Sequence, residues 1–308
     1  MAWRFLVLPL VVFAACAMDP ARAARDQALT DLDIAVGQHR FAQAEAQART
    51  FLAVPTGRLD ERCPALLALA RAVDGQGRAA EALDLLATLG RECASVPESS
   101  ARGLVEVASL AERLGNKAVA ERAWSRVVTA FPDDPAAQRA AEAVRDLRKE
   151  AAGPDAAIEA LRRLYRVVPD RQVSPFLLFL AARLAEPTAP DRALSLYRRI
   201  AEAHPASGMA NDATLAAGRL ALALGRPREA ADLAERLLAQ REWSYLLGSY
   251  DLDLYPDAAF LRAEAAAAAR EPPAAVAGWY DAFVRWFPKD SRASEARTRA
   301  AAALATPP

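Results

Sequence analysis

Apolar residues recur along nearly the whole chain with the spacing of amphipathic helices. Between Ala24 and Leu304 they return every three or four residues, and clusters of Gly, Pro or Asp interrupt the pattern at intervals. This period places apolar side chains on one face of a helix, and the interruptions are typical of helix ends. The chain is also rich in alanine and has few β-branched runs, which favours closely packed helices. We therefore expect an all-α protein made of many short helices.

The interruptions follow a fixed register. A proline that should end a helix follows an aromatic or imidazole ring at three places, Phe131-Pro132, His204-Pro205 and Phe287-Pro288. Eight residues before these prolines stand Trp124, Tyr197 and Tyr280. Twelve residues before them stand Ala120, Ala193 and Val276. Twenty-four residues before them stand Ala108, Ala181 and Glu264, of which the glutamate departs from the pattern. A fourth proline, Pro169, has Leu161 and Ala157 at the first two of these distances.

Helix packing explains why these residue types recur. Small residues in both helices of a pair let the two backbones approach closely, and an aromatic ring four residues later fills the gap to the next pair. Proline ends the second helix because it has no backbone N–H to donate. This register resembles the tetratricopeptide repeat family over nearly the whole chain after residue 24. Two further units keep small residues twelve apart, with glycines in their turns: Ala70, Gly77 and Ala82, and Gly218, Gly225 and Ala230.

The resemblance implies a right-handed α-solenoid of about seven tetratricopeptide-like helix pairs, a superhelix spanning residues 24–304. The expected pairs span residues 24–55, 63–94, 101–134, 138–170, 174–207, 211–242 and 257–290. A C-terminal amphipathic helix over residues 291–304 should cap the last apolar face.

One segment, residues 241–256, interrupts the repeat with a longer and more aromatic sequence. It contains Trp243, Tyr245, Tyr250 and Tyr255, and the stretch from Trp243 to Phe287 holds ten of the 21 aromatic residues of the chain. The rings either fold back and fill the gap between two pairs or form a binding surface, since exposed aromatics are common interface anchors. The sequence leaves both interpretations open.

The first 15 residues have the features of a secretory signal. A basic residue, Arg4, precedes an uncharged apolar run that is too short for a transmembrane helix. Phe13-Ala14-Ala15-Cys16 resembles the bacterial lipobox, which implies cleavage before Cys16 and acylation of its thiol, followed by a linker over residues 16–23. In enteric bacteria an aspartate directly after the acylated cysteine retains a lipoprotein in the inner membrane. Because Ala17 stands at that position, the resemblance implies an outer-membrane destination. The alternative is an ordinary signal cut after Ala17 or Ala23.

The other two cysteines, Cys63 and Cys93, form a candidate disulfide. Cys63 opens one expected helix and Cys93 lies just past the end of the next, and these two ends are neighbours in an antiparallel hairpin. If Cys16 carries the lipid, two of the three cysteines remain, and a pair that can form a disulfide agrees with export to an oxidising compartment. The alternative is two unrelated buried thiols.

Charge and chemistry exclude several classes of function. Lys and Arg number 39 and Asp and Glu also 39, so the chain as a whole has no electrostatic signature of a nucleic-acid or anionic-membrane binder. The two histidines, His39 and His204, fall at expected turns or helix ends without metal-ligand spacing, and we find no phosphate loop or nucleophile elbow. Asp251, Asp253 and Asp257 alternate but lack the glycine and glutamate of a calcium loop. We expect no metal, cofactor or catalytic residue.

The resemblance implies that the first helix of each pair lines a concave side, where partner peptides lie. By helix phase the candidates there are Arg102, Val105, Arg139, Glu142, Leu178, Arg219, Leu222, Leu261 and Arg262.

The expected function is therefore a non-enzymatic scaffold or adaptor, lipid-anchored in the bacterial cell envelope, whose partners are other envelope proteins. Its layout is loosely similar to the repeat lipoprotein of outer-membrane barrel assembly. The alternatives are a soluble periplasmic binding module for a small ligand or glycan, or an auxiliary subunit of an outer-membrane assembly or secretion machine. Soluble lytic transglycosylases also carry a helical superhelix, but here the repeat leaves no room for a catalytic domain.

Overall fold

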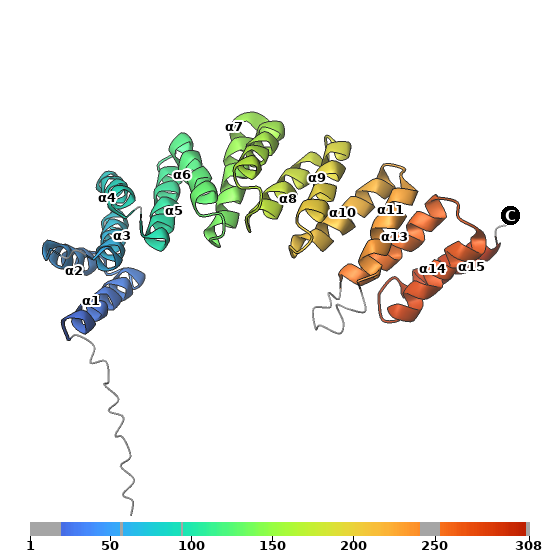
Figure 1. The fold of residues 1–308 in the computed structure, drawn as a ribbon, viewed down its shortest axis with the longest axis horizontal. Coiled ribbons are helices and arrows are strands. Elements are labelled where there is room, and N and C mark those ends of the chain that lie inside the picture. The colour runs from blue at the N-terminus through green and yellow to red at the C-terminus, as the bar shows by residue number, and fades with distance from the viewer. Residues whose placement is uncertain (1–19, 56–57, 94, 241–252, 306–308) are drawn as a thin grey trace, which may run out of the picture. The chain divides into compact units, whose positions relative to one another are not determined.

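The computed structural model describes residues 20–55, 58–93, 95–240 and 253–305 of the 308-residue chain. All regular elements in these residues are α-helices, and within each unit helices that follow one another in sequence pack together as hairpins (Figure 1). The predicted all-α solenoid is therefore confirmed. The chain divides into two compact units, one ending at Leu110 and the other beginning at Ala111.

Unit 1 contains the first two predicted pairs and the greater part of a further helix. Its elements are α1 (Pro20–Gly37), α2 (Phe41–Ala53), α3 (Leu59–Gly75), α4 (Ala79–Glu92) and α5 (Pro97–Arg113), whose last turn lies in unit 2. Helix α1 packs on both α2 and α3, and α3 packs on α4. Because α1 begins at Pro20, it includes the last four residues of the expected linker.

Unit 2 continues the repeat. Its elements are α6 (Lys117–Ala130), α7 (Ala136–Val167), α8 (Ser174–Ala185), α9 (Pro190–Ala203), α10 (Met209–Ala223), α11 (Pro227–Leu238), α13 (Leu254–Ala268), α14 (Pro273–Trp286) and α15 (Ala293–Ala305). Helix α7 covers the fourth predicted pair as far as Val167, and Gly153 divides it at a kink with φ 83° and ψ 176°. Helix α15 packs on α14, where the capping helix was expected. None of the described helices is long and apolar enough to cross a membrane.

The prolines end the second helices as their register predicts. Phe131, Val168, His204 and Phe287 each stand directly before a proline and donate their own N–H to the carbonyl four residues earlier. The next residue cannot extend the ladder, because its ring nitrogen carries no hydrogen. The turns inside the pairs repeat as well: Gly77, Gly115 and Gly225 take positive φ, and so do His39 and Arg270 at the same place in other pairs.

The small-residue positions are confirmed, with one shift. Ala70, Ala108 and Gly218 are buried seven residues before the positive-φ residue of their turns. In the last pair the residue seven before Arg270 is Ala263, which is fully buried, whereas Glu264 is partly exposed and pairs with Arg299. The apparent departure at Glu264 arises because the chain from the turn residue Arg270 to Pro288 is one residue longer than the chain from Gly115 to Pro132.

The predicted aromatic positions fill the gaps between helices. Trp124, Tyr197 and Tyr280 are all at most 2% exposed. Each polar end finds a partner: Trp124 Nε1 donates to Glu112 at 2.7 Å, Tyr197 donates to Glu186, and Arg299 donates to the Tyr280 hydroxyl at 3.2 Å. Burial raises the pKa of Tyr197, so its hydroxyl remains a donor. Buried rings of this kind dominate core energetics when their polar atoms are satisfied.

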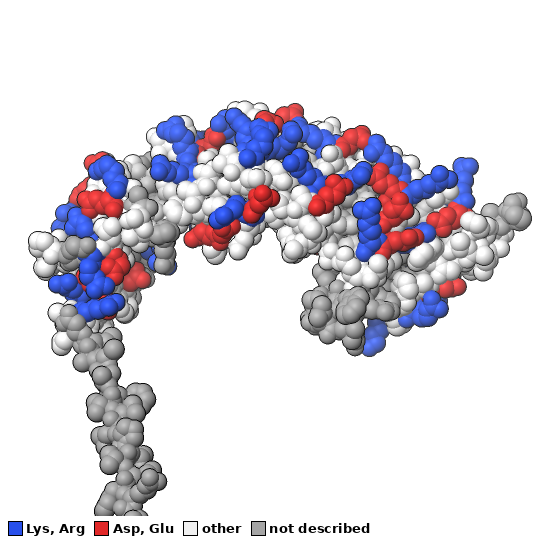
Figure 2. Space-filling view, viewed as in Figure 1, with Lys and Arg blue, Asp and Glu red and all other residues white. Residues whose placement is uncertain are grey.

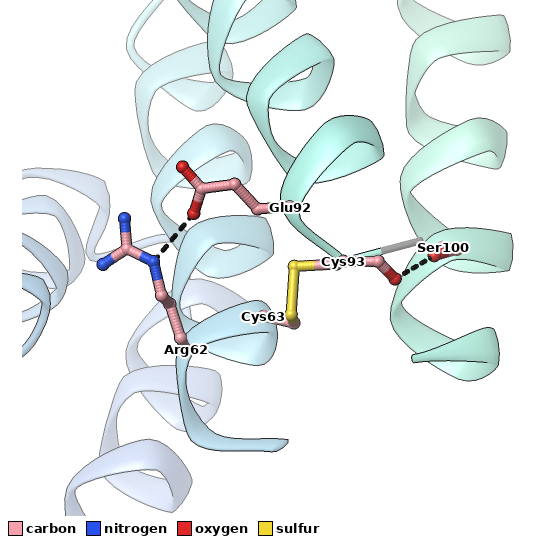
Figure 3. Close-up of a disulfide and its surroundings, with 5 residues drawn as sticks. All are labelled: Arg62, Cys63, Glu92, Cys93 and Ser100. Atoms are coloured by element: carbon pink, nitrogen blue, oxygen red, sulfur yellow. Dashed lines mark hydrogen bonds and ion pairs between the residues drawn. A yellow bond between two sulfur atoms is a disulfide. The ribbon is translucent and has the colours of Figure 1, made fainter. Parts of the chain in front are cut away.

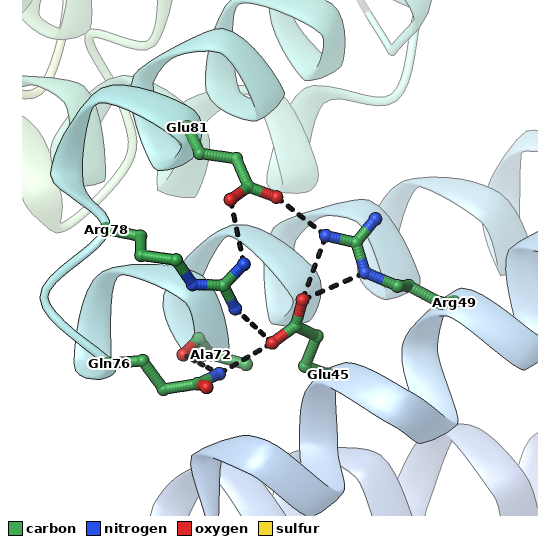
Figure 4. A network of polar contacts seen from close by, with 6 residues as sticks. All are labelled: Glu45, Arg49, Ala72, Gln76, Arg78 and Glu81. Carbon is green, nitrogen blue, oxygen red and sulfur yellow. Dashed lines mark hydrogen bonds and ion pairs between the residues drawn. The ribbon is translucent and has the colours of Figure 1, made fainter.

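A polar network ties the second helix of the first pair to the second pair (Figure 4). The Glu45 carboxylate on α2 accepts from Gln76 at 2.8 Å, from Arg49 at 2.9 Å and from Arg78. Both arginines also donate to Glu81 on α4. The hydrogen bond from Gln76, together with the two arginines, lowers the pKa of Glu45 to about 2. Glu45 is therefore a carboxylate over nearly the whole pH range of the folded protein.

Candidate partner-binding groove

The first helices of consecutive pairs in unit 1 enclose an open hollow of about 500 Å³. Its lining comes from α1, α3 and α5: Leu29, Thr30, Leu32, Asp33, Ile34, Pro64, Leu67, Ala68, Arg71 and Arg102. On α3 the lining residues are spaced three or four apart, so they lie on one helix face. We call this hollow the unit 1 groove. Of the predicted groove residues, Arg102 lines it, and Val105 lies partly buried one turn later on α5.

The groove has an apolar floor and a charged rim. Leu32 and Leu67 are 2% and 4% exposed and form the floor, whereas Ile34 at the rim is 45% exposed. Arg71 on α3 donates from Nε to Glu106 on α5 at 2.9 Å, and Arg102 lies one turn before Glu106. Asp33 is exposed on the α1 side. This lining can bury an apolar side chain of a partner and form ion pairs with charges beside it. Protein interfaces commonly have such an apolar centre and a polar rim.

The two cysteines of unit 1 lie beside the groove and form a disulfide (Figure 3). Their Cα atoms are 5.8 Å apart, and both side chains are fully buried. An ion pair between Arg62 and Glu92 at 2.8 Å stands next to the bond. Ser100 on α5 donates its hydroxyl to the Cys93 carbonyl at 2.5 Å. The start of α3, the end of α4 and the start of α5 are therefore held together where they support the groove wall.

A buried carboxylate, Glu61, joins α1 to α3 and was not found by sequence reasoning. It is 2% exposed, and its two oxygens face Arg25 on α1 at 3.4 Å and Arg58 at 3.2 Å. The Arg58 contact is a charge contact, since Glu61 Oε1 accepts no hydrogen bond of good geometry in the described residues. No local pattern distinguishes this glutamate from the exposed ones, because its burial depends on where α1 packs.

The predicted groove positions of unit 2 divide into buried and exposed residues. Leu178, Leu261 and Arg262 are 2%, 4% and 6% exposed, so their assignment to a partner surface is wrong. Helices α8 and α13 are covered by neighbours on more than one side, because each packs on α10 as well as on its own pair. The remaining residues are Arg139 and Glu142, both exposed, Arg219, which is exposed and pairs with Asp257, and Leu222, which is partly buried.

Arg262 has become part of the core. Its guanidinium reaches Glu235 on α11 at 2.6 Å and Glu271 at 3.0 Å, and it lies 4.2 Å above the ring of Trp279 on α14. A planar, always charged group suits this position, since it can pair with two carboxylates while stacking on an aromatic ring. Arg262 therefore fixes three helices rather than a ligand.

The aromatic insertion is described only at its end. Trp243, Tyr245 and Tyr250 lie outside the described residues. Tyr255 belongs to α13, is 1% exposed and packs in a cluster with Leu215, Leu237 and Leu261. For Tyr255 the packing interpretation is correct and the binding-surface interpretation is wrong. The predicted insertion therefore ends before α13 begins at Leu254.

The polar residues considered for chemistry have structural positions. His39 is exposed in a turn and meets Phe41 edge-on at 5.3 Å, and His204 meets Tyr165 edge-on at 5.9 Å. Burial lowers the pKa of His204, which keeps the ring neutral. Asp257 pairs with Arg219 and Arg292. Across the described ranges, no three His, Cys, Asp or Glu side chains gather in a way that could hold a metal ion.

Comparison with solved structures identifies the fold class of the chain. No protein-family model matches the chain, and no curated protein matches it. The structure of the C-terminal part of a TPR repeat-containing protein from Cytophaga hutchinsonii is similar over 87% of this chain and 98% of that chain, with 13% sequence identity and a TM-score of 0.50. A tetratricopeptide repeat protein from Parabacteroides merdae matches over 91% and 99%, with 14% identity and a TM-score of 0.38. Pseudomonas aeruginosa pilF matches over 75% and 97%, with 17% identity and a TM-score of 0.40. The first of these likenesses shows that the chain has the fold of a tetratricopeptide-type solenoid.

Proposed function

We propose that this protein is a non-enzymatic scaffold that binds segments of other envelope proteins in the unit 1 groove. The observation that supports this most directly is the composition of the groove: an apolar floor, an exposed isoleucine and guanidinium groups at the rim. A partner side chain can be buried there while its neighbours form ion pairs, which gives both affinity and orientation. In the described part of the chain the groove lining includes no cysteine or histidine that could act as a nucleophile or base.

The disulfide supports a location outside the reducing cytoplasm. Structural disulfides persist in the periplasm and are rare in cytosolic proteins. Together with the lipobox resemblance at Phe13–Cys16, we propose that the protein is anchored through acylated Cys16 in the outer membrane and faces the periplasm. The partners are then other envelope proteins, and we assign no role to nucleic acid.

The second candidate is a soluble periplasmic module for a small ligand or glycan. The volume of the groove favours it, since small-molecule sites commonly have 300–1,000 Å³. A third is an auxiliary subunit of an outer-membrane assembly or secretion machine, which is a narrower form of the proposed scaffold. The exposed rim argues against a small ligand, because such sites usually enclose most of the ligand surface.

Anchoring is tested by mass spectrometry of the mature protein and of a Cys16→Ser variant. We expect an acylated Cys16 in the wild-type membrane fraction and release of the variant from it. An unmodified mature protein that begins at Met18 or Ala24 would show the alternative cleavage and remove the anchor.

The groove is tested by Ile34→Glu, with Leu114→Glu as the matched control. Both residues are exposed leucine-sized side chains, at 45% and 54%, but only Ile34 lines the groove. Proteins crosslinked to the tagged full chain in cells should be lost with Ile34→Glu and retained with Leu114→Glu, while both variants melt like the wild type. Equal loss with both variants, or retention with both, would contradict a role for the groove.

A further inference from the structure

Ion pairs join the polar faces of successive second helices in unit 2. Arg192 on α9 reaches Asp155 at 3.5 Å and Glu159 at 4.0 Å on the second half of α7. Between α9 and α11, Arg198 donates to Glu229 at 3.0 Å and Arg226 donates to Asp191. The chain thus uses one kind of contact repeatedly: an arginine of one helix pairs with a carboxylate of the helix beside it.

Between α7 and α9 this pairing leaves an excess of arginines. Glu159 alone is shared by Arg162 at 3.4 Å, Arg166 at 2.9 Å and Arg192 at 4.0 Å. The bond from Arg166 and the charges of its neighbours lower the pKa of Glu159, which keeps it ionised. Two more arginines, Arg163 and Arg199, form no ion pair with any described residue.

We call Arg162, Arg163, Arg166, Arg192 and Arg199 the arginine patch. These five arginines outnumber the two carboxylates that pair with them, Asp155 and Glu159, by three (5 − 2), although the formal charge of the whole chain is zero. Figure 2 shows basic side chains gathered over α7. The neutrality of the chain as a whole therefore does not exclude a charged docking surface.

The side chains of the patch are exposed to solvent, and a contact with an aromatic ring already holds one of them in place without a partner. The side chains of Arg162 and Arg166 are 42% and 57% exposed. The guanidinium of Arg199 lies 5.1 Å from the ring of the buried Tyr165, which fixes its position. Val167, directly after Arg166, is 64% exposed and supplies an apolar contact at the edge. Arginine beside an aromatic and an exposed apolar residue is typical of the energetic centre of a protein interface.

We propose that the arginine patch docks an acidic amphipathic helix of a partner protein. This inference rests on the proposed scaffold function and adds a second surface with a defined partner chemistry. Arg192 and Arg199 are seven residues apart on α9, which is about 10.5 Å along the helix axis. Carboxylates at positions i, i+3 and i+7 of a partner helix span the same distance, so such a helix repeats the contact that α9 makes with α11.

The regular spacing and Val167 favour a protein over a membrane. A membrane surface attracts basic residues through its charge density and requires no particular spacing. A helix with carboxylates on one side and an apolar residue at its edge matches both features of the patch.

The test uses the full chain in non-ionic detergent and a fluorescent synthetic helix with glutamates at i, i+3 and i+7. The patch variant is Arg163→Glu, Arg166→Glu and Arg199→Glu. The matched control is Arg122→Glu, Arg228→Glu and Arg236→Glu, which changes the net charge equally at exposed positions outside the patch. A glutamine version of the peptide and vesicles containing phosphatidylglycerol are measured in parallel. A second patch variant carries glutamine at the three positions, which removes the positive charges without adding negative ones that could disturb folding. Thermal melts of every sample show whether each variant is folded.

We expect the glutamate peptide to bind the wild type and the control variant at least about tenfold more tightly than either folded patch variant. The glutamine peptide should not bind, and binding should weaken with salt. Equal weakening by the control variant would show a net-charge effect and overturn the proposal. Binding to vesicles but not to the peptide, abolished by the patch variants, would assign the patch to a membrane and also overturn it. Because the groove variant Ile34→Glu leaves the patch intact, failure of peptide binding leaves the groove test standing.

Discussion

At the scale of single residues, the groups that matter most are charged side chains whose surroundings the sequence does not reveal. Glu45 and Arg262 look like ordinary members of amphipathic helices, yet Glu45 joins α2 to the turn between α3 and α4, and Arg262 joins α13 to α11 and α14. Glu45 lies in a partly open cluster, whereas the Arg262 side chain is 8% exposed. Their contributions to stability should therefore differ in size and in pH dependence.

Glu45 should make the stability of unit 1 depend on acid pH. Its pKa falls from 4.5 to about 2 on folding, chiefly through the Gln76 hydrogen bond. A carboxyl whose pKa is lowered contributes stability that is complete above pH 4.5 and is lost as pH falls toward 2. We expect Glu45→Gln to lower the free energy of unfolding by about 1 kcal/mol at pH 7, because water screens the cluster, and to have little effect near pH 2.

Urea denaturation at several pH values measures this difference. Glu150→Gln is the control, since Glu150 is 63% exposed and pairs only with Lys117 among the described residues. A constant difference between wild type and Glu45→Gln over the whole pH range would contradict the assignment.

Arg262→Ala should destabilise unit 2 by about 3 kcal/mol, because it leaves two carboxylates and the face of Trp279 without their partner. Arg262→Lys should recover only part of this loss, since an ammonium can neither donate as a planar fork nor stack in the same way. Urea denaturation provides the values, with the exposed Arg297→Ala as control. Full recovery by lysine would mean that charge alone stabilises the site.

At the scale of elements, the disulfide connects the second turn of α3 with the residue directly after α4. The two helices also pack through buried residues, among them Ala70 and Ala82, which let their backbones approach closely. The covalent link adds to this packing in holding α3 against α4. The Ser100 hydrogen bond extends that support to α5.

Removing the link with Cys63→Ser and Cys93→Ser should lower the free energy of unfolding of unit 1 by about 3–4 kcal/mol on the chain-entropy estimate for a loop of this length. Thermal melts of wild type and variant check the loss, and dithiothreitol should shift only the wild type. A non-reducing peptide map that recovers both thiols free from exported protein would refute the bond itself.

At the scale of the whole molecule, the helices in the described ranges pack mainly on their close neighbours in sequence, so stability is distributed along the repeat. The end of unit 2 is completed by α15, whose Ala293, Ala296 and Ala300 are buried against α14. Arg292, directly before α15, and Arg299 within it add cation–π contacts to Phe260 at 5.0 and 5.4 Å. Terminal helices of this kind protect the last apolar face from water.

Ala296→Asp should loosen the repeat from its C-terminal end, because it buries an unpaired carboxylate in the α14–α15 contact. Hydrogen exchange should accelerate most in α14 and α13 and remain unchanged in α8. Ala301→Asp, on the exposed side of the same helix, is the control. Equal acceleration in α8 would show that unit 2 unfolds as one cooperative block.

The sequence by itself determined the helix pairs of this protein, and particular residues show why. Proline after Phe131, His204 and Phe287 ends a helix through covalent geometry, and alanine at 108 or 181 permits close packing through its size. Such properties depend only on the residue and its near neighbours in sequence, so they can be predicted from the sequence without knowledge of the tertiary structure. The positions of Trp124, Tyr197 and Tyr280 followed from the same register.

The tertiary structure alone decided which polar and apolar faces remain open. Leu178, Leu261 and Arg262 have the same helix phase as open groove residues, yet neighbouring helices cover them. The unit 1 groove and the arginine patch both arise where residues far apart in sequence meet, as Arg71 meets Glu106 and Arg192 meets Glu159. Exposure and local charge depend on the distances between helices, and those distances are set by packing across many residues rather than by any local pattern.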